Sequence, residues 1–213
     1  MKIGLMMNPV ERSWRGSGRR LLVPVGMLYL IGIMEGIEVL RQRRRGARRS
    51  LVSSTADRDP RSVKLLALTW WPAGETALVA AAALPRLAAP GAWSRRALWT
   101  GVVVTGLGIG LRQWAIATLG RYFVGHVVIQ PEHKVIGNGP YRWLRHPSYT
   151  GFWLEMIGVG ISTGNLLSAA LCTIVPLIGV RARIVGEERE LVAGLPGYRE
   201  YSRTRRRLIP FVW

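Results

Sequence analysis

Four apolar stretches, separated by polar and basic segments, dominate the pattern of side chains along this chain. The first three are residues 21–40, 65–84 and 97–119, and each has about the 20 residues that a helix needs to cross a bilayer. The fourth, residues 148–180, is interrupted at 162–165 by Ser-Thr-Gly-Asn, a sequence typical of a turn. Two antiparallel helices joined by a tight turn explain this fourth stretch. The pattern therefore predicts an all-α integral membrane protein with about five transmembrane helices, the last two forming a helical hairpin.

The predicted hairpin is short for a membrane crossing. Each arm has about 15 residues, or roughly 22 Å at the helical rise per residue, against a hydrocarbon core of ~30 Å. The sequence leaves open whether this hairpin crosses the whole bilayer.

Composition and charge agree with a membrane protein. Of the 213 residues, 49% are hydrophobic, yet the formal net charge is +18. Five helices would place 21 of the 30 Lys and Arg residues on one side, which the positive-inside rule makes cytosolic. The basic run Arg41–Arg49 lies between two predicted membrane segments. We therefore interpret it as a loop facing anionic lipid and expect no nucleic-acid partner.

Glu75, Arg112 and Glu155 fall well inside the apolar stretches, and Glu35 and Glu38 lie near the predicted cytosolic end of the first one. A charge in a membrane is costly and needs a partner or a wet cavity. Arg112 and Glu155 each lie seven residues from the predicted cytosolic face, roughly 10 Å deep. We expect Arg112 to pair with Glu155, and more weakly with Glu75, as a structural clasp between helices.

The segment 120–151 is rich in Gly, Pro, His, Arg and Tyr, although it lies between two membrane helices. Polar irregular backbone at a membrane boundary usually lines a cavity. Pro147 suits the first turn of the next helix, and Ser148 belongs to the same turn, where free N–H groups favour an anionic group such as a carboxylate. The single cysteine, Cys172, excludes an internal disulfide and a cysteine-based zinc site, and no metal site is expected.

The motifs of this segment and of the following residues resemble those of the isoprenylcysteine carboxyl methyltransferase family. The resemblance covers about residues 120–213, and the wider superfamily includes phospholipid N-methyltransferases. It divides the chain into 1–96, with N-terminal membrane helices and a basic loop, and 97–213, a methyltransferase core. The residues that carry it are His133, the turn Gly139, Pro140 and Tyr141, the run Arg145, His146, Pro147, Ser148, Tyr149, Thr150 and Gly151, then Asn165, Arg183, Glu187, Glu188, Leu191, Tyr198, Tyr201 and the tail Ile209, Pro210 and Phe211.

The resemblance implies an S-adenosylmethionine site, with S-adenosylhomocysteine as product, in a cytosolic pocket formed by the 120–147 loop and the C-terminal helix. Arg183 and Asn165 would bind the acceptor substrate, and Arg183 and Glu187 are the expected catalytic pair. The expected cofactor-binding residues are Gln130, His133, Lys134, Val135, Ile136, Tyr141, His146, Pro147, Ser148, Tyr149 and Glu187.

The residues are chemically suited to methylation of a carboxylate. A carboxylate is already ionised at neutral pH, so the reaction needs alignment and exclusion of water rather than a general base. Arg183 and Glu187 are four residues apart and share a helix face, pointing away from the apolar side of that helix. A surface salt bridge between them is the alternative interpretation, and Tyr198 and Tyr201 are expected to be packing residues.

The sequence thus predicts a membrane S-adenosylmethionine-dependent methyltransferase acting on an isoprenylcysteine-like or other lipophilic acid. The expected partners are a lipophilic or prenylated substrate and membrane lipids, with multi-pass insertion and an active site facing the cytosol. Two alternatives remain at this point: a phospholipid amine N-methyltransferase, whose ammonium acceptor needs a base, and a non-catalytic membrane lipid-binding protein. The sequence does not indicate an oligomeric state.

Overall fold

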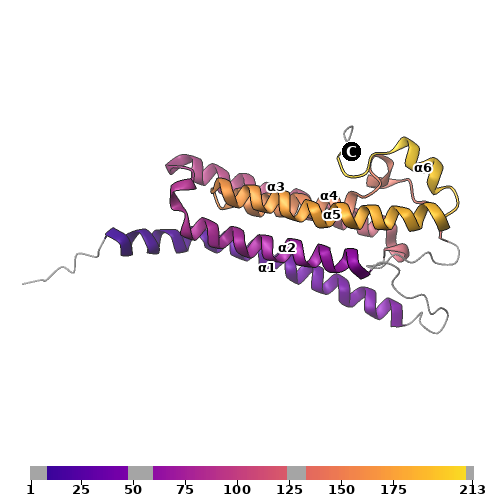
Figure 1. Cartoon of the computed structure of the whole chain (residues 1–213), viewed down its shortest axis with the longest axis horizontal. Coiled ribbons are helices and arrows are strands. Elements are labelled where there is room, and N and C mark those ends of the chain that lie inside the picture. The colour runs from indigo at the N-terminus through magenta and orange to yellow at the C-terminus, as the bar shows by residue number, and fades with distance from the viewer. Residues whose placement is uncertain (1–8, 48–59, 124–132, 210–213) are drawn as a thin grey trace, which may run out of the picture.

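The computed structural model describes residues 9–47, 60–123 and 133–209, and this part of the chain is almost entirely helical. The five long helices lie side by side (Figure 1). No strand occurs among the described residues, so the predicted all-α class is confirmed. The helices are α1 (Pro9–Ala47), α2 (Pro60–Ala83), α3 (Gly91–Leu119), α4 (Pro147–Ser162), α5 (Leu166–Gly194) and the short α6 (Tyr198–Thr204), with 3₁₀ turns η1 (Pro85–Leu87), η2 (Gly120–Tyr122) and η3 (Gly139–Arg142).

The predicted hairpin is present as α4 and α5. α4 ends at Ser162, and Gly164 turns the chain with a φ of 64°, a conformation that glycine adopts without strain. The arms are unequal, since α4 has 16 residues and α5 has 29. α5 therefore continues well beyond the apolar stretch and carries Arg183 and Glu187 on the same helix.

Three segments are long and apolar enough to cross a membrane by length and composition: Leu21–Arg41, Ala92–Tyr122 and Leu166–Gly194. α2 and α4 are not among them, so a total of five spans stays a prediction. The helix ends do fall into the two predicted groups. The ends of α1, α3 and α5 lie at one end of the bundle, together with the starts of α2 and α4 and with α6 (Figure 1).

Glycines bring α3 and α4 into close contact. A Cβ atom on Gly108 would lie 2.6 Å from the carbonyl oxygen of Gly151, and one on Gly151 would lie 2.6 Å from that of Gly108. About two helical turns away, Gly101 and Gly158 approach the opposite helix in the same way. Small residues at such spacing let membrane helices pack backbone against backbone, so α3 and α4 form a tightly joined pair.

The ion pair of Arg112 differs from the prediction. Its Nε atom donates to Oε1 of Glu35 on α1 at 2.6 Å, and a second guanidinium nitrogen donates to the backbone oxygen of Ser148 at 3.0 Å. Glu155 lies close enough to interact electrostatically but does not form the ion pair among the described residues. The predicted pairing with Glu155 is therefore wrong in its partner, because α1 packs against α4 and brings Glu35 within reach of the Arg112 side chain. The clasp joins α1 to α3.

Candidate functional site

The chain after α5 folds back over the start of α4. The backbone N–H groups of Arg145 and His146 donate to the carbonyl oxygens of Arg206 and Arg207, at 2.8 and 3.0 Å. The Thr150 hydroxyl donates to the carbonyl oxygen of Leu208 at 2.7 Å. These bonds hold α6 and the following residues against the 133–146 segment. The candidate site therefore lies at this end of the bundle.

Glu188 is the electrostatic centre of this junction. Its Oε1 atom lies 2.7 Å from a guanidinium nitrogen of Arg145 and accepts from His146 Nε2 at 3.2 Å, while Oε2 accepts from Arg207 Nε at 2.7 Å. The carboxylate is 6% exposed. A buried carboxylate surrounded by three cationic or donor groups fixes their positions, so Glu188 joins α5, the start of α4 and the C-terminal residues.

Arg183 and Glu187 meet at one side chain of α4. The hydroxyl of Tyr149 donates to Oε2 of Glu187 at 2.9 Å and accepts from Nε of Arg183 at 3.2 Å. Arg183 is only 3% exposed, so the alternative of a surface salt bridge is wrong. The two expected catalytic residues thus share a hydroxyl inside the bundle.

A narrow cavity of about 80 Å³ opens beside this trio. Seven of the expected cofactor-binding residues line it, namely His133, Lys134, Val135, Ile136, Tyr141, His146 and Glu187. Pro147, Ser148 and Tyr149 form the adjacent first turn of α4, and Gln130 lies outside the described residues. The remaining lining residues were not expected to bind the cofactor: Leu119, Tyr122, Arg145, Leu191, Leu195, Tyr198 and Tyr201.

Among these additional residues, Leu119, Tyr122 and Leu195 lie outside the motifs, whereas Arg145, Leu191, Tyr198 and Tyr201 belong to the motifs but were not expected to bind the cofactor. Tyr122 precedes the first motif residue, His133, and its ring stacks on the His133 ring with centroids 4.5 Å apart. Tyr198 and Tyr201 lie on α6, where the packing role expected for them is only part of the picture, because both border the cavity. Their place among the residues that carry the resemblance, and their spacing of three, which puts them on one helix face, were the available signals.

The buried polar atoms that have no hydrogen-bond partner in the described part of the chain include Nε of Arg145 and two others at the cavity, Nδ1 of His133 and the hydroxyl of Tyr198. Burial lowers the pKa of His133, which favours a neutral imidazole. Burial, together with the charges of Glu188 and Glu187, raises the pKa of the Tyr198 hydroxyl, which therefore stays protonated. Buried polar groups normally have partners, so these two atoms are positioned to bind a ligand.

Asn165 does not join the other expected substrate residue, Arg183. Its side-chain oxygen accepts from the backbone N–H of Ser168 at 3.1 Å, capping α5, and its amide nitrogen donates to the carbonyl oxygen of Leu84 at 3.0 Å. At 2% exposure, the side chain is buried in the hairpin turn. This turn lies at the end of α5 opposite to α6 (Figure 1), so the structure gives Asn165 a structural part.

The fold and the site together define an all-helical membrane protein whose chemistry is concentrated at one end of the bundle. Residues 99–193 match the model of the isoprenylcysteine carboxyl methyltransferase (ICMT) family. The resemblance that the motifs indicated is thereby confirmed over this segment.

Similar proteins point to the same family. The chain is 33% identical over 118 residues to a probable protein-S-isoprenylcysteine O-methyltransferase of Oryza sativa subsp. indica, covering 54% of this chain and 61% of that protein. It is 26% identical over 103 residues to the uncharacterized protein YpbQ of Bacillus subtilis, covering 48% and 58%. The chain thus spans about six tenths of the length of these relatives.

A solved structure shares the fold. The eukaryotic intramembrane Ras methyltransferase ICMT superposes with a TM-score of 0.62 at 24% identity, over 98% of this chain and 70% of that one. At this identity the match establishes the helical arrangement. What the chain does must be inferred from its own residues.

Proposed function

We propose that this protein is an S-adenosylmethionine-dependent methyltransferase that methylates the carboxylate of a lipophilic acid, such as an isoprenylcysteine. The contact that carries the proposal is the Tyr149 hydroxyl, which joins Arg183 and Glu187 beside the cavity. This contact places Arg183 and Glu187 on the same side of α5. Arg183 can bind the carboxylate of an acceptor, and Glu187 can bind an ammonium group. This pair suits a reaction in which a group is transferred to an anionic acceptor from a donor that contains an amino-acid group.

The residues of the cavity fit the implied cofactor. Apolar walls from Leu119 and Leu191, the aromatic face of Tyr141, and the unpartnered His133 and Tyr198 atoms are suited to an adenosine group. Glu187 offers a carboxylate to the amino-acid ammonium. S-adenosylmethionine would supply a methyl group on a positively charged sulfur. Because ligand pockets usually measure about 300–1,000 Å³, a cofactor of this size must widen the cavity or extend beyond it.

Arg183 would hold the acceptor. A guanidinium binds one carboxylate oxygen with directional N–H groups and leaves the other oxygen available. The Tyr149 hydroxyl accepts from Nε of Arg183, so it fixes the orientation of the guanidinium. Because the acceptor is already ionised, these residues need only to orient it and to exclude water.

The buried guanidinium also favours a carboxylate over an amine. A phospholipid amine would approach as an ammonium, which Arg183 repels, and it would require a base to remove a proton. We therefore rank phospholipid N-methylation second. A non-catalytic lipid-binding protein has no need of the polar cavity.

Orientation and division of the chain complete the proposal. The cavity lies at the end of the bundle that contains the end of α1 and the start of α2 (Figure 1), next to the basic residues that the positive-inside rule assigns to the cytosol. We infer a multi-pass protein with a cytosolic site, in which 97–213 is the methyltransferase core, 1–96 completes the membrane part, and a prenylated or other lipophilic substrate enters from the bilayer.

Methyl transfer to an N-acetylated prenylcysteine tests this function. The purified protein in detergent should incorporate labelled methyl from S-adenosylmethionine, and Arg183→Ala and Glu187→Gln should abolish incorporation. Arg199→Ala and Glu200→Gln, which replace exposed α6 residues outside the cavity, serve as matched controls. Isothermal titration of S-adenosylhomocysteine should show binding by wild type and Arg183→Ala but weak binding by Glu187→Gln.

The outcomes separate the alternatives. Methylation of phosphatidylethanolamine in place of the prenylcysteine would establish the amine reaction and overturn the assignment of Arg183. Absence of S-adenosylhomocysteine binding would leave only the non-catalytic interpretation. Equal activity in both site variants and both controls would refute the residue assignments.

A further inference from the structure

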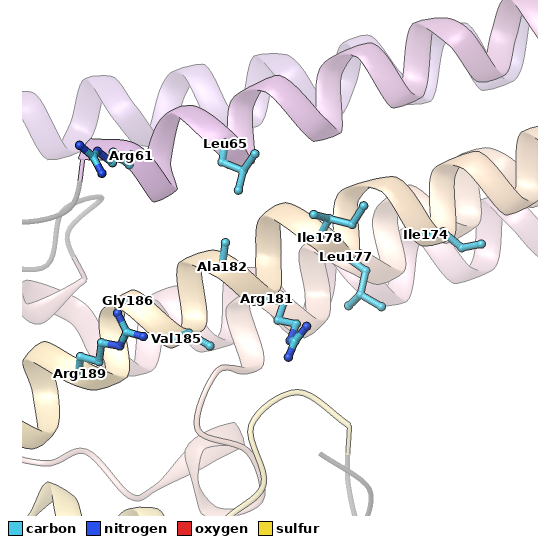
Figure 2. Close-up of a pocket in the computed structure, with 10 residues that line it drawn as sticks. All are labelled: Arg61, Leu65, Ile174, Leu177, Ile178, Arg181, Ala182, Val185, Gly186 and Arg189. Carbon is cyan, nitrogen blue, oxygen red and sulfur yellow. The ribbon is translucent and has the colours of Figure 1, made fainter.

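A second, larger hollow lies on the other side of α5. It is a groove of about 770 Å³ between the start of α2 and residues 174–189 of α5 (Figure 2). None of its lining residues borders the cavity described above. The groove is lined by Arg61 and Leu65 from α2 and by Ile174, Leu177, Ile178, Arg181, Ala182, Val185, Gly186 and Arg189 from α5.

Helix geometry separates the groove from the candidate methyltransferase site. Arg181 and Arg183 are two residues apart, which places their Cα–Cβ directions roughly 200° apart around the helix. Arg183 is buried against Tyr149, whereas Arg181 is exposed in the groove. The occupant of the groove is therefore distinct from the group that Arg183 holds.

Three exposed arginines border the groove: Arg61, Arg181 and Arg189. No acidic side chain of the described residues forms an ion pair with any of them. Arg181 and Arg189 belong to a segment long and apolar enough to span a membrane. Cations on such helices normally have an anionic partner, and here the protein supplies none within its described part.

The groove changes from basic to apolar along its length. Arg61 and Arg189 lie at one end in Figure 2, and Ile174 lies at the other. From Arg189 to Arg181 the axial distance is about 12 Å, and from Arg181 to Ile174 about a further 10 Å, by the helical rise. Leu65 and Ile178 line the floor, and the small side chain of Ala182 leaves space between the helices. This arrangement matches a molecule with an anionic head and an apolar tail.

We propose that the groove binds an anionic glycerophospholipid. The phosphate and its acidic headgroup lie among Arg61, Arg181 and Arg189, and an acyl chain runs along Ile178 and Ile174. Basic pockets at the cytosolic ends of membrane helices bind anionic headgroups, and the apolar floor selects a lipid over a free phosphate. The bound lipid neutralises the arginines and joins α2 to α5.

The experiment is native mass spectrometry of the full chain in detergent with added phosphatidylglycerol or phosphatidylcholine. Wild type should retain phosphatidylglycerol in preference to phosphatidylcholine. Arg181→Gln/Arg189→Gln should lower phosphatidylglycerol affinity by about 25-fold, since each arginine near a lipid surface contributes about 1 kcal/mol, or about fivefold. Arg199→Gln/Arg203→Gln, which removes two exposed cations from α6 at the same end of the bundle, should leave affinity unchanged.

A volume-filling variant tests the apolar part. Ala182→Phe keeps every charge, so it should weaken phosphatidylglycerol binding only if an acyl chain occupies the groove. Equal losses in the two double arginine variants would show a general charge effect and overturn the proposal. Equal retention of both lipids, unchanged binding in Ala182→Phe, or displacement of the lipid by millimolar inorganic phosphate would also overturn it.

Discussion

Gly108 offers the most direct test of how α3 and α4 are held together. In Gly108→Ala, the new Cβ atom would lie 2.6 Å from the Gly151 oxygen and 2.7 Å from the Glu155 nitrogen, both backbone atoms. Ordinary contact begins at 3.4 Å, so the two backbones must separate by about 0.8 Å in a tightly packed interior. Backbone atoms cannot rotate away as a side chain does, and the helices must move.

The matched control is Gly110→Ala, because Gly110 is exposed on the same helix and its added Cβ atom would meet nothing within 4 Å. Both substitutions gain the helix propensity of alanine, about 1 kcal/mol. Their difference therefore isolates the close approach, which should cost Gly108→Ala about 1–3 kcal/mol, the range for overpacked interiors. For a chain of this size the unfolding midpoint should fall by about 2–4 °C per kcal/mol relative to Gly110→Ala.

The assay is thermal unfolding of the purified protein in detergent, followed by tryptophan fluorescence. Gly151→Ala should behave like Gly108→Ala, and the double variant should lose less than the sum, because helices already moved apart accommodate the second Cβ atom. If Gly108→Ala and Gly110→Ala unfold at the same temperature, the inferred backbone contact between α3 and α4 does not exist.

Three further predictions concern single side chains. Removing the charge of either Glu35 or Arg112 (Glu35→Gln or Arg112→Leu) should cost about 3–5 kcal/mol of unfolding free energy, because the partner is left unpaired inside the bundle. A double-mutant cycle should show a coupling energy between the two residues. Additive effects of the two substitutions would contradict the ion pair. Tyr149→Phe should lower methyl transfer by about 10–100-fold, since a hydrogen bond to a charged group contributes about 1.5–3 kcal/mol; full activity would show that the hydroxyl does not position the pair. Burial lowers the pKa of His133 below 6.5, so the folded state binds fewer protons than the unfolded state. Stability should be complete above pH ~6.5 and fall as the pH drops through the lower folded-state pKa, and His133→Asn should remove part of this slope.

The helices and the neighbourhood of the site could be predicted because hydrophobic pattern and local motifs depend on nearby residues. The hairpin turn and the meeting of the 133–146 segment with Glu187 both follow from such signals. The partner of Arg112 could not be predicted in this way. Its depth along α3 followed from counting residues, but the neighbour on that side, Glu35 of α1, depends on how the helices are arranged around one another.

Another part of the site could not be predicted because it depends on backbone hydrogen bonds. The tail is fixed by the N–H groups of Arg145 and His146, which leave no pattern in side-chain types. The packing of α3 on α4 did leave a signal, since Gly101 and Gly108 are seven residues apart and so are Gly151 and Gly158. That repeated spacing of small residues predicts a helix pair.

The hydrogen bonds from Arg145 and His146 to Arg206 and Arg207 also affect how the protein is made. One wall of the cavity comes from α6, and its anchoring residues follow every long helix in the order of synthesis. Since a chain is synthesised from its N-terminal end, α1 to α5 are made before these residues. A chain truncated after α5 would keep the five long helices, but it would lack Tyr198, Tyr201 and the guanidinium of Arg207 that binds Glu188. Affinity for the proposed cofactor should therefore require the residues that follow the membrane helices.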